Sequence, residues 1–390
     1  MPRPRNVAKV YLFAAIFFCL LSSLSSLSLA QSNANHPTGP NGIVVKSKFG
    51  GQIFGYDIDQ NGTEGVLAEA LLQSNGNVLA AVETFNQKTG KITKVLTQTD
   101  DQDDFIVRGV VGTSVGLYEH EHVISFLNVQ RTFDSVNPLS GNKITGLWTP
   151  PIGTEHLLSE VSHTQGSTNN AILAMDNSGN FITWVFSSDV ATNTFGPIVK
   201  IQDTLDFGSV PPPMAYDTVT NQAILGGGDG CFGCFPVIGL ADLTHGTFSK
   251  FTGMGFGFVN GIAVDSADGL FVTDTEDDAS VEFYTLSTET GFTVVLPNSG
   301  ENQIFSGADI EYDPIHKLFL VSQPVSSSTS SGSSIYVYDT NGVLQETLNG
   351  FSFSNSFNVF GAYIAIDPST RTGFMQGPDS GVTELQGFSY

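Results

Sequence analysis

The strongest constraint on the fold is a short pattern that recurs along most of the chain. Each copy has an apolar run, usually an Asp, a tight turn and a second apolar run, and the clearest copies are residues 262–272 and 310–320. The copies align on the residue before the turn, which gives seven markers: Gln73, Tyr118, Asp176, Asp217, Asp265, Asp313 and Asp367. The intervals between markers fall in the forties and fifties, which is typical of propeller blades.

One period contains four strand-length runs. Residues 261–265, 269–274, 281–287 and 291–296 alternate or are apolar, and turn clusters separate them. An Asp before a turn favours a tight hairpin, because its carboxylate can accept hydrogen bonds from nearby backbone N–H groups. No stretch shows sustained helical periodicity with caps. We therefore predict an all-β fold, a single β-propeller with seven four-stranded blades. Six blades is the alternative, because residues 45–130 are the least regular.

The last copy of the pattern is one strand short. It has strands near residues 363–367, 372–376 and 382–387, and then the sequence ends. Residues 42–56 precede the first copy and contain two short apolar runs. We predict that this N-terminal segment supplies the missing strand and closes the ring, which removes open sheet edges. Residues 42–390 then form one propeller domain, after a polar leader at residues 31–41.

The first thirty residues have the pattern of a signal peptide. Arg3, Arg5 and Lys9 precede an unbroken apolar run at residues 10–21, and a small-residue pattern ends at Ala30. We predict cleavage before Gln31 and export to an extracellular or periplasmic location. The alternative is an uncleaved anchor over residues 10–30. No later segment is long and apolar enough to predict a membrane span in the mature chain.

The net charge excludes two classes of partner, and the cysteines indicate a disulfide. The chain has 15 Lys and Arg against 38 Asp and Glu, a formal net charge of −23. Such an acidic protein cannot neutralise phosphates, which excludes nucleic acid and anionic lipid surfaces as partners. Loss of the signal peptide leaves Cys231 and Cys234, in Cys-Phe-Gly-Cys. In an exported protein this spacing favours a local disulfide, with free thiols or a redox pair as the alternatives.

Two stretches of the best copy carry a family resemblance. Asn260-Gly261-Ile262-Ala263-Val264-Asp265 and the strand at residues 269–274 resemble the repeats of exported propellers of the NHL, YVTN and SMP-30/gluconolactonase-like groups. The resemblance implies a propeller fold but no single function, because these groups include lactonases, binding modules and assembly scaffolds.

A candidate metal site follows from the positions four to six residues before the markers, which we expect at the entries of the strands next to the axis, where a propeller has one central opening. Glu69, Asn170, Asn260 and Asp309 carry hard oxygen ligands of the kind that Ca²⁺ prefers. The SMP-30-like lactonases are similar, since they hold one divalent metal with Glu, Asn and Asp at strand entries on the axis. Asn260 matches that family's position, whereas Glu69 and Asp309 are each one residue out of register. The competing interpretation is that these are ordinary polar residues at loop-to-strand junctions.

Other constellations favour structural interpretations. His120 and His122 share a strand face and could bind a transition metal, but no third ligand is evident nearby. Acidic clusters at residues 100–104 and 274–278 lack the spacing of a calcium loop and are typical of solvated turns. A G-x-S-x-G match at residues 112–116 is followed by strand sequence, so it lacks the elbow that a nucleophile needs.

The sequence therefore leads to two hypotheses. The first is a secreted, monomeric, non-catalytic propeller that binds a small molecule, a carbohydrate or a protein through one face. The alternative is a metal-dependent, lactonase-like hydrolase with Glu69, Asn170, Asn260 and Asp309 around one divalent cation such as calcium. There the metal would polarise the carbonyl and activate water.

Overall fold

The computed structural model describes most of the chain after residue 37. The described ranges are 38–59, 63–76, 78–101, 117–118, 122–127, 133–136, 143–148, 156–163, 169–175, 181–189, 194–202, 213–228, 236–252, 259–275, 280–297, 309–323, 333–351, 363–376 and 384–390. Residues 35–390 fall into one compact unit. The predicted signal peptide and the Cys231–Cys234 pair lie outside the described residues.

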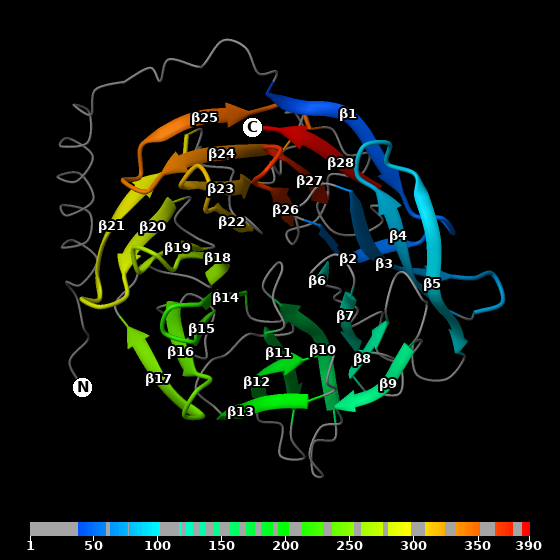
Figure 1. The fold of residues 1–390 in the computed structure, drawn as a ribbon, viewed down its shortest axis with the longest axis horizontal. Helices are drawn as coiled ribbons and strands as arrows, with labels where there is room; N and C mark the ends of the chain where they lie inside the picture. Colours follow the sequence, from blue (N-terminus) through cyan, green and yellow to red (C-terminus); the bar gives the residue numbers. More distant parts are fainter. Residues whose placement is uncertain are drawn as a thin grey trace, which may run out of the picture. The chain divides into compact units, whose positions relative to one another are not determined.

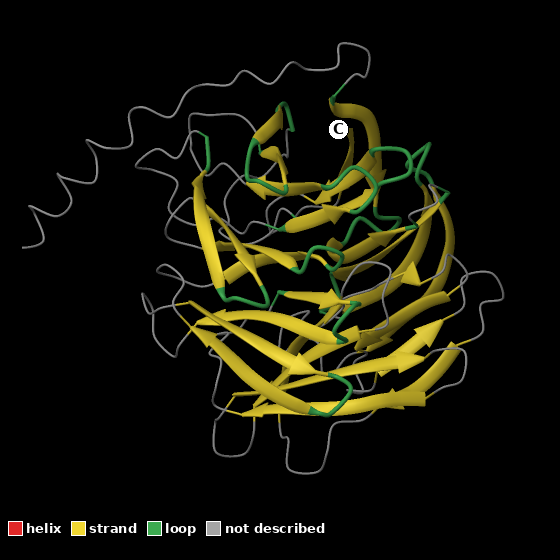
Figure 2. Ribbon diagram, turned by 60° about the vertical axis from the view of Figure 1, so that its left-hand side comes forward, coloured by secondary structure: helices red, strands yellow, loops and turns green. Residues whose placement is uncertain are grey.

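Every regular element in these ranges is a β-strand, and Figure 2 shows no helix among them. Four antiparallel sheets come from the first two thirds of the chain. They are β2 (Gln52–Ile58), β3 (Glu64–Leu72), β4 (Val78–Asn86) and β5 (Ile92–Asp101); β6 (Leu117–Tyr118), β7 (His122–Leu127), β8 (Phe133–Val136) and β9 (Lys143–Trp148); β10 (His156–His163), β11 (Asn169–Met175), β12 (Phe181–Asp189) and β13 (Thr194–Gln202); and β14 (Met214–Asp217), β15 (Gln222–Gly228), β16 (Pro236–Asp242) and β17 (Thr247–Thr252).

Three more sheets complete the set, so the described strands form seven four-stranded sheets. They are β18 (Val259–Asp265), β19 (Leu270–Thr275), β20 (Ser280–Thr285) and β21 (Thr290–Val295); β22 (Ile310–Asp313), β23 (Leu318–Gln323), β24 (Ser334–Asp339) and β25 (Leu344–Leu348); and β26 (Ile364–Asp367), β27 (Thr372–Gln376), β28 (Glu384–Ser389) and β1 (Gly39–Lys46). The first strands of the sheets lie toward the centre and the fourth toward the outside (Figure 1). The fold is an all-β propeller, as predicted.

The N-terminal strand completes the last sheet, which confirms the predicted closure. β1 pairs antiparallel with β28, from Gly39 opposite Ser389 to Lys46 opposite Glu384. The predicted segment was wrong in its bounds, however. Residues 39–46 join the last sheet, whereas β2 begins at Gln52 and is the first strand of the next sheet. Residues 47–51 therefore connect the two sheets that meet where the ring closes.

Four of the marker aspartates end the first strand of their sheet, as the repeat predicted. Each carboxylate accepts a hydrogen bond from a backbone N–H two residues later, over distances of 2.8–3.1 Å. These residues are Asp217, Asp265, Asp313 and Asp367, all buried. Their short side chains satisfy the turn locally, and this explains the Asp preference at the marker.

Two other markers were assigned to the wrong strand. Gln73 follows β3, and the copy that ends at Asp176 lies on β11, so both follow second strands. In the first sheet the residue that corresponds to the aspartates is Asp59, which follows β2 and accepts a hydrogen bond from the Thr63 hydroxyl at 3.0 Å. Any hairpin with an apolar run and a turn matches the pattern, whichever strand it follows.

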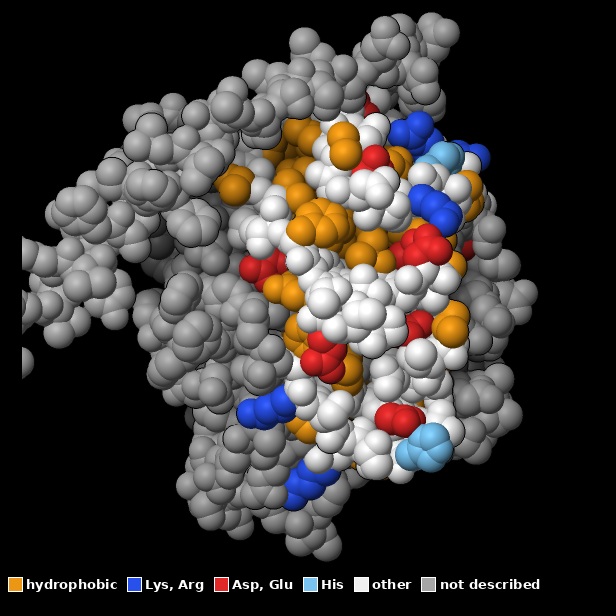
Figure 3. All heavy atoms as spheres, turned by 90° about the vertical axis from the view of Figure 1, so that its left-hand side faces the viewer, with side chains coloured by type: hydrophobic (Ala, Val, Ile, Leu, Met, Phe, Trp, Pro, Cys, Tyr) orange, Lys and Arg blue, Asp and Glu red, His pale blue; other side chains and the backbone are white. Residues whose placement is uncertain are grey.

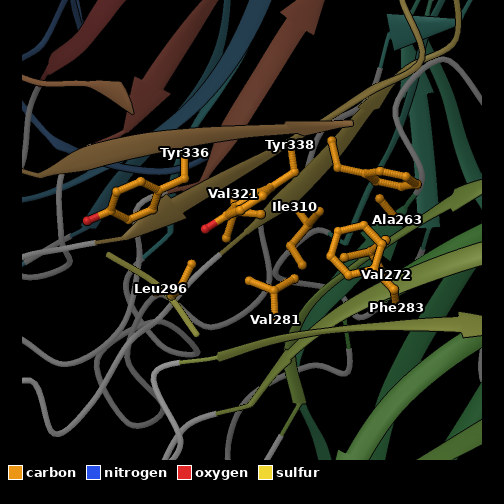
Figure 4. Close-up of a cluster of buried hydrophobic side chains, with 10 residues drawn as sticks. Ala263, Val272, Val281, Phe283, Leu296, Ile310, Val321, Tyr336 and Tyr338 are labelled. Atoms are coloured by element: carbon orange, nitrogen blue, oxygen red, sulfur yellow. The ribbon is translucent and has the colours of Figure 1, made fainter. Parts of the chain in front are cut away.

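Apolar side chains fill the space between neighbouring sheets. Between β18–β21 and β22–β25 the cluster includes Val272, Val281, Phe283, Phe319 and Tyr338, all fully or almost fully buried (Figure 4). The Phe283 and Phe319 rings meet edge to face at 5.8 Å between centroids. Burial of such large side chains is the main source of stability, and it fixes the angle between adjacent sheets.

Candidate functional site

The four predicted metal ligands do not share one structural position. Asn260 lies on β18 and Asp309 directly precedes β22, and both are first strands. Glu69 lies on β3 and Asn170 on β11, which are second strands. The expectation that all four lie at the entries of inner strands is therefore wrong for Glu69 and Asn170, because it rested on the misplaced markers. The side chains of Asn170 and Asn260 lie outside the described part of the structure.

Glu69 holds the loop that connects the last sheet to the first. Its side chain is fully buried. One carboxylate oxygen accepts the backbone N–H of Phe49 at 3.0 Å, and the other accepts the N–H of Gly51 at 2.8 Å. Both oxygens therefore bind the backbone of residues 47–51. This arrangement gives Glu69 a structural role at the closure of the ring.

Glu83 is a second buried carboxyl at the same loop, and sequence analysis missed it. It lies on β4 and accepts the N–H of Lys48 at 3.0 Å. Burial raises the pKa of Glu83 to about 7; the Lys48 N–H opposes the shift and the neighbouring Glu69 adds to it. The one signal in the sequence was a single acid inside the apolar strand at residues 78–85.

Asp309 connects two sheets. One carboxylate oxygen accepts the N–H of Ile310 at 3.0 Å, and the other accepts the N–H of Ile364 on β26 at 2.9 Å. Its own N–H donates to the Ser322 hydroxyl at 2.9 Å. Burial raises the pKa of Asp309 to about 6, although the two N–H groups favour the ionised form.

A group of acidic side chains and one tyrosine gathers on the inner strands around Asp309. Burial, followed by the charges of Asp309 and Asp57, raises the pKa of Glu311 well above its usual range. Burial and the same carboxylates, with Glu311, raise the pKa of Tyr56. The Tyr56 hydroxyl donates to the carbonyls of Tyr363 at 2.8 Å and Phe374 at 2.6 Å. This polar group binds β2 to the last sheet.

The described carboxyls do not assemble into a metal centre. Within the described ranges, no three His, Cys, Asp or Glu side chains lie in an arrangement that could hold a metal ion. His120 and the side chain of His122 are outside those ranges, as are the side chains of residues 100–104. The metal site proposed from Glu69, Asn170, Asn260 and Asp309, and the Cys231–Cys234 disulfide, stay predictions.

Comparisons with known proteins identify the fold and no family. No family model matches the sequence, and no curated protein matches it. The similar solved structures include a chain from the crystal structure of the mitotic checkpoint complex, at 15% identity, with 94% of this chain and 98% of that chain covered and a TM-score of 0.57. The structure of U3-55K (10% identity, 90% and 100% covered, TM-score 0.57) and the crystal structure of the RRP9 WD40 repeats (11% identity, 90% and 99% covered, TM-score 0.56) are also similar.

These likenesses extend over almost the whole chain, so they support a propeller for the entire described unit. At 10–15% identity they carry information on the fold alone. The neighbours include WD40 propellers, and the resemblance to NHL, YVTN and SMP-30-like repeats stays a prediction. Among the described residues, no helix has the length and apolar character that a membrane span requires.

Proposed function

We propose that this chain is an exported, seven-bladed β-propeller that acts as a non-catalytic module for binding a protein partner. Each of the seven four-stranded sheets would be one blade, with β1 as the outer strand of the last. A ring of this kind presents many loops and sheet edges on one rigid frame. Proteins commonly place binding residues on loops that a rigid scaffold positions.

The observation that carries this proposal is the use of two carboxylates, the buried Glu69 and the half-buried Asp309. Glu69 and Asp309 are the two predicted metal ligands with described side chains, and each binds backbone N–H groups with both oxygens. Each of these oxygens accepts a backbone N–H, so the carboxylates hold neighbouring segments of the ring together. The arrangement favours a scaffold over a catalytic centre.

The similar solved structures share the fold, and one of them comes from a complex. One of them is a chain from a mitotic checkpoint complex, and for that protein the propeller is part of an assembly. Protein binding is a use that propellers of this size support without any catalytic constellation. We therefore favour a protein over a small molecule or a carbohydrate as the partner.

Export is proposed from the sequence of residues 1–30 and can be tested first. Expression of the full chain with its own leader, followed by N-terminal sequencing of the exported product, should give Gln31 as the first residue. Alkylation of that product without reductant should label neither Cys231 nor Cys234. An unprocessed N-terminus would overturn the export proposal, and labelling of both cysteines would overturn the disulfide.

The binding function is tested with the mature chain as bait in extracellular or periplasmic fractions, matched to the source of the protein. A captured protein should bind the purified chain at a fixed stoichiometry by isothermal calorimetry, and thermally unfolded chain should not bind it. The same preparation should be assayed with a panel of lactones after loading with Ca²⁺, Mn²⁺ or Zn²⁺. Metal-dependent turnover that Asp309→Asn abolishes would replace the binding proposal with the hydrolase alternative, which no described contact favours.

A further inference from the structure

The outer strand β21 differs from the other outer strands of the ring. Its sequence, Thr-Gly-Phe-Thr-Val-Val, contains no charged residue and no proline. Each of the other six fourth strands carries at least one charge. Those charged residues include Lys94 in β5, Lys143 in β9, Lys200 in β13, Lys250 in β17, Glu346 in β25 and Lys46 in β1. Charges and prolines on an edge strand prevent pairing with other chains, and β21 lacks this protection.

The surface around β21 is exposed and apolar. Phe292 is 46% exposed and Val295 is 66% exposed, on a strand whose residues are nearly all exposed. Val343, in the turn between β24 and β25, is 43% exposed. That turn lies against β21, because a Cβ on Gly342 would come within 2.6 Å of the Phe292 ring. We define Phe292 and Val343 as the edge patch; Val295 lies on the same edge strand, but its side chain is on the opposite face of the sheet.

Figures 1 and 3 place this region on one side of the ring. β21 lies at the left in Figure 1, and Figure 3 looks directly onto that side. Hydrophobic side chains form a broken band across the described part of this face (Figure 3). Phe292 is held rigidly, since its ring stacks on the buried Phe283 at 5.0 Å between centroids. A fixed aromatic ring beside a sheet edge is a suitable anchor for a partner side chain.

An edge strand has a specific binding chemistry. β21 is the last strand of its sheet and pairs with β20 alone among the described strands. On such an edge, alternate residues direct their N–H and C=O groups away from the sheet, where an extended peptide can pair with them. Neighbouring side-chain positions then select the sequence of the added strand.

We propose that β21 is a docking edge, at which an extended, cationic segment of a partner protein adds as a fifth strand. This proposal rests on the binding function proposed above and names where the partner binds. Charge selects the occupant. The chain has a net charge of −23, and the exposed Glu289 immediately precedes β21 while Asp339 begins the turn that contains Val343. The added strand would carry apolar residues against the edge patch and Lys or Arg toward these carboxylates.

A second copy of this chain is a poorer occupant. Two β21 strands could pair, because neither strand contains a charged residue. The two copies as wholes would repel each other, however, since each has the same large negative net charge. Opposite charge on a partner removes this repulsion and accelerates association.

The test uses the mature chain and a fluorescein-labelled peptide in which Val and Thr alternate between terminal Lys residues. Val295→Lys places a cation on the edge, and Ser249→Lys is the matched control on the exposed part of β17, where Lys250 already lies. Fluorescence anisotropy should show binding at least about tenfold weaker in V295K, with S249K unchanged from the parent. If V295K melts early, Thr293→Lys replaces it. An N-methylated peptide, and one with Glu in place of Lys, should each bind at least about tenfold more weakly.

Equal binding by V295K and S249K would overturn the docking edge, and so would equal binding of the N-methylated peptide. Equal binding of the Glu peptide would overturn the cationic partner. If the parent chain sediments as a dimer and V295K sediments as a monomer, the occupant of the edge is a second copy of the chain. If a captured natural partner binds V295K and the parent with equal affinity, the binding function stands, but β21 is not its site. Failure to capture any partner would count against the function itself.

Discussion

The junction where the ring closes and an ordinary junction between consecutive sheets are built from different chemistry. Between β18–β21 and β22–β25 the buried contact is mainly a cluster of aliphatic and aromatic side chains. One hydroxyl, that of Tyr336, donates to the Pro297 carbonyl at 2.8 Å, and the Lys317–Asp268 ion pair lies at the exposed surface. At the closure, the apolar cluster of Val45, Ile53 and Phe374 is joined by buried polar groups. There Glu69 and Glu83 bind the backbone of residues 47–51, and the Tyr56 hydroxyl reaches the last sheet.

The difference shows what closure of the ring requires. An ordinary junction joins segments that are near one another in sequence, and apolar burial is its main contact. The closure joins residues separated by more than three hundred positions. The Tyr56 hydroxyl donates to the Phe374 carbonyl, and the Gln376 side-chain amide donates to the Ile53 carbonyl at 2.8 Å. Directional hydrogen bonds add to the register that the buried apolar faces already specify there.

Removal of β1 should cause the largest loss of stability among the changes at the two junctions. Deletion of residues 39–46 removes the buried Val45 side chain and all hydrogen bonds to β28, and it exposes an open edge. We expect a loss of at least about 5 kcal/mol in the free energy of unfolding, with aggregation. Urea unfolding and light scattering measure both effects. Deletion of residues 31–36 is the control. If the variant without β1 stays monomeric and has the free energy of unfolding of the parent, the closure is contradicted.

An apolar truncation tests the ordinary junction. Phe319→Ala removes a fully buried ring between the β18–β21 and β22–β25 sheets. The expected loss in the free energy of unfolding is about 3–5 kcal/mol, by creation of a cavity. The loss should be the same at every pH where the parent folds, because no titratable group is removed. A loss that changes with pH would show that polar groups also hold this junction.

The ring should lose stability as pH rises, through Glu83 at the closure and Asp309 at the adjacent junction with the last sheet. The pKa of Glu83 is raised to about 7 and that of Asp309 to about 6, so the folded state takes up these protons more readily than the unfolded chain. The stabilisation is complete below the ordinary carboxyl range and is lost as pH rises through about 6 to 7. Between about pH 5 and pH 8 the free energy of unfolding should fall by roughly 4 kcal/mol, with the larger share from Glu83.

Glu83→Gln separates the contribution of Glu83 from that of Asp309. The amide oxygen can still accept the Lys48 N–H, but the residue no longer titrates. Chemical unfolding at several pH values should show a flatter profile and a variant more stable than the parent at alkaline pH. Glu289→Gln, at an exposed turn, is the control and should leave the profile unchanged. A parent whose stability rises from pH 5 to 8 would contradict this assignment.

The smallest expected effect is that of one hydroxyl. Tyr56→Phe leaves the carbonyls of Tyr363 and Phe374 without their shared donor, while the apolar ring still fills the closure cluster. We expect a loss of about 1–2 kcal/mol in the free energy of unfolding by urea titration. The corresponding change away from the closure is Tyr284→Phe, whose hydroxyl donates to Glu282 at 3.0 Å. Equal losses in the two variants would show that the closure depends on no special polar contact.

The regular part of the fold could be predicted because its signals are local. The aspartates 217, 265, 313 and 367 satisfy their own turns, so each hairpin is visible within a few residues of sequence. The missing last strand was also predictable, since a four-stranded repeat that ends after three strands needs a partner from elsewhere.

The errors arose where position depends on pairing between distant segments. The turns after Leu72 and Met175 have the same local pattern as the others, yet they follow second strands. Nothing near Gln73 distinguishes the two cases. The roles of Glu83 and Tyr56 depend on residues 48 and 374, and no local pattern indicates such contacts. Two candidate ligands, Glu69 and Asn170, were placed on the wrong strand for the same reason.

We propose that Glu69 and Asp309 are structural carboxylates in a binding propeller and hold no metal. Calorimetric melting after chelation, with Ca²⁺, Mn²⁺ or Zn²⁺ added back at high ionic strength, tests it directly because salt screens the exposed acidic surface. We predict no shift in Tm with any of the three metals. A bound ion would stabilise the fold by RT ln(1 + [L]/Kd), about 2.7 kcal/mol at one hundred times Kd. A shift that persists in high salt and disappears in both Glu69→Gln and Asp309→Asn would contradict the claim.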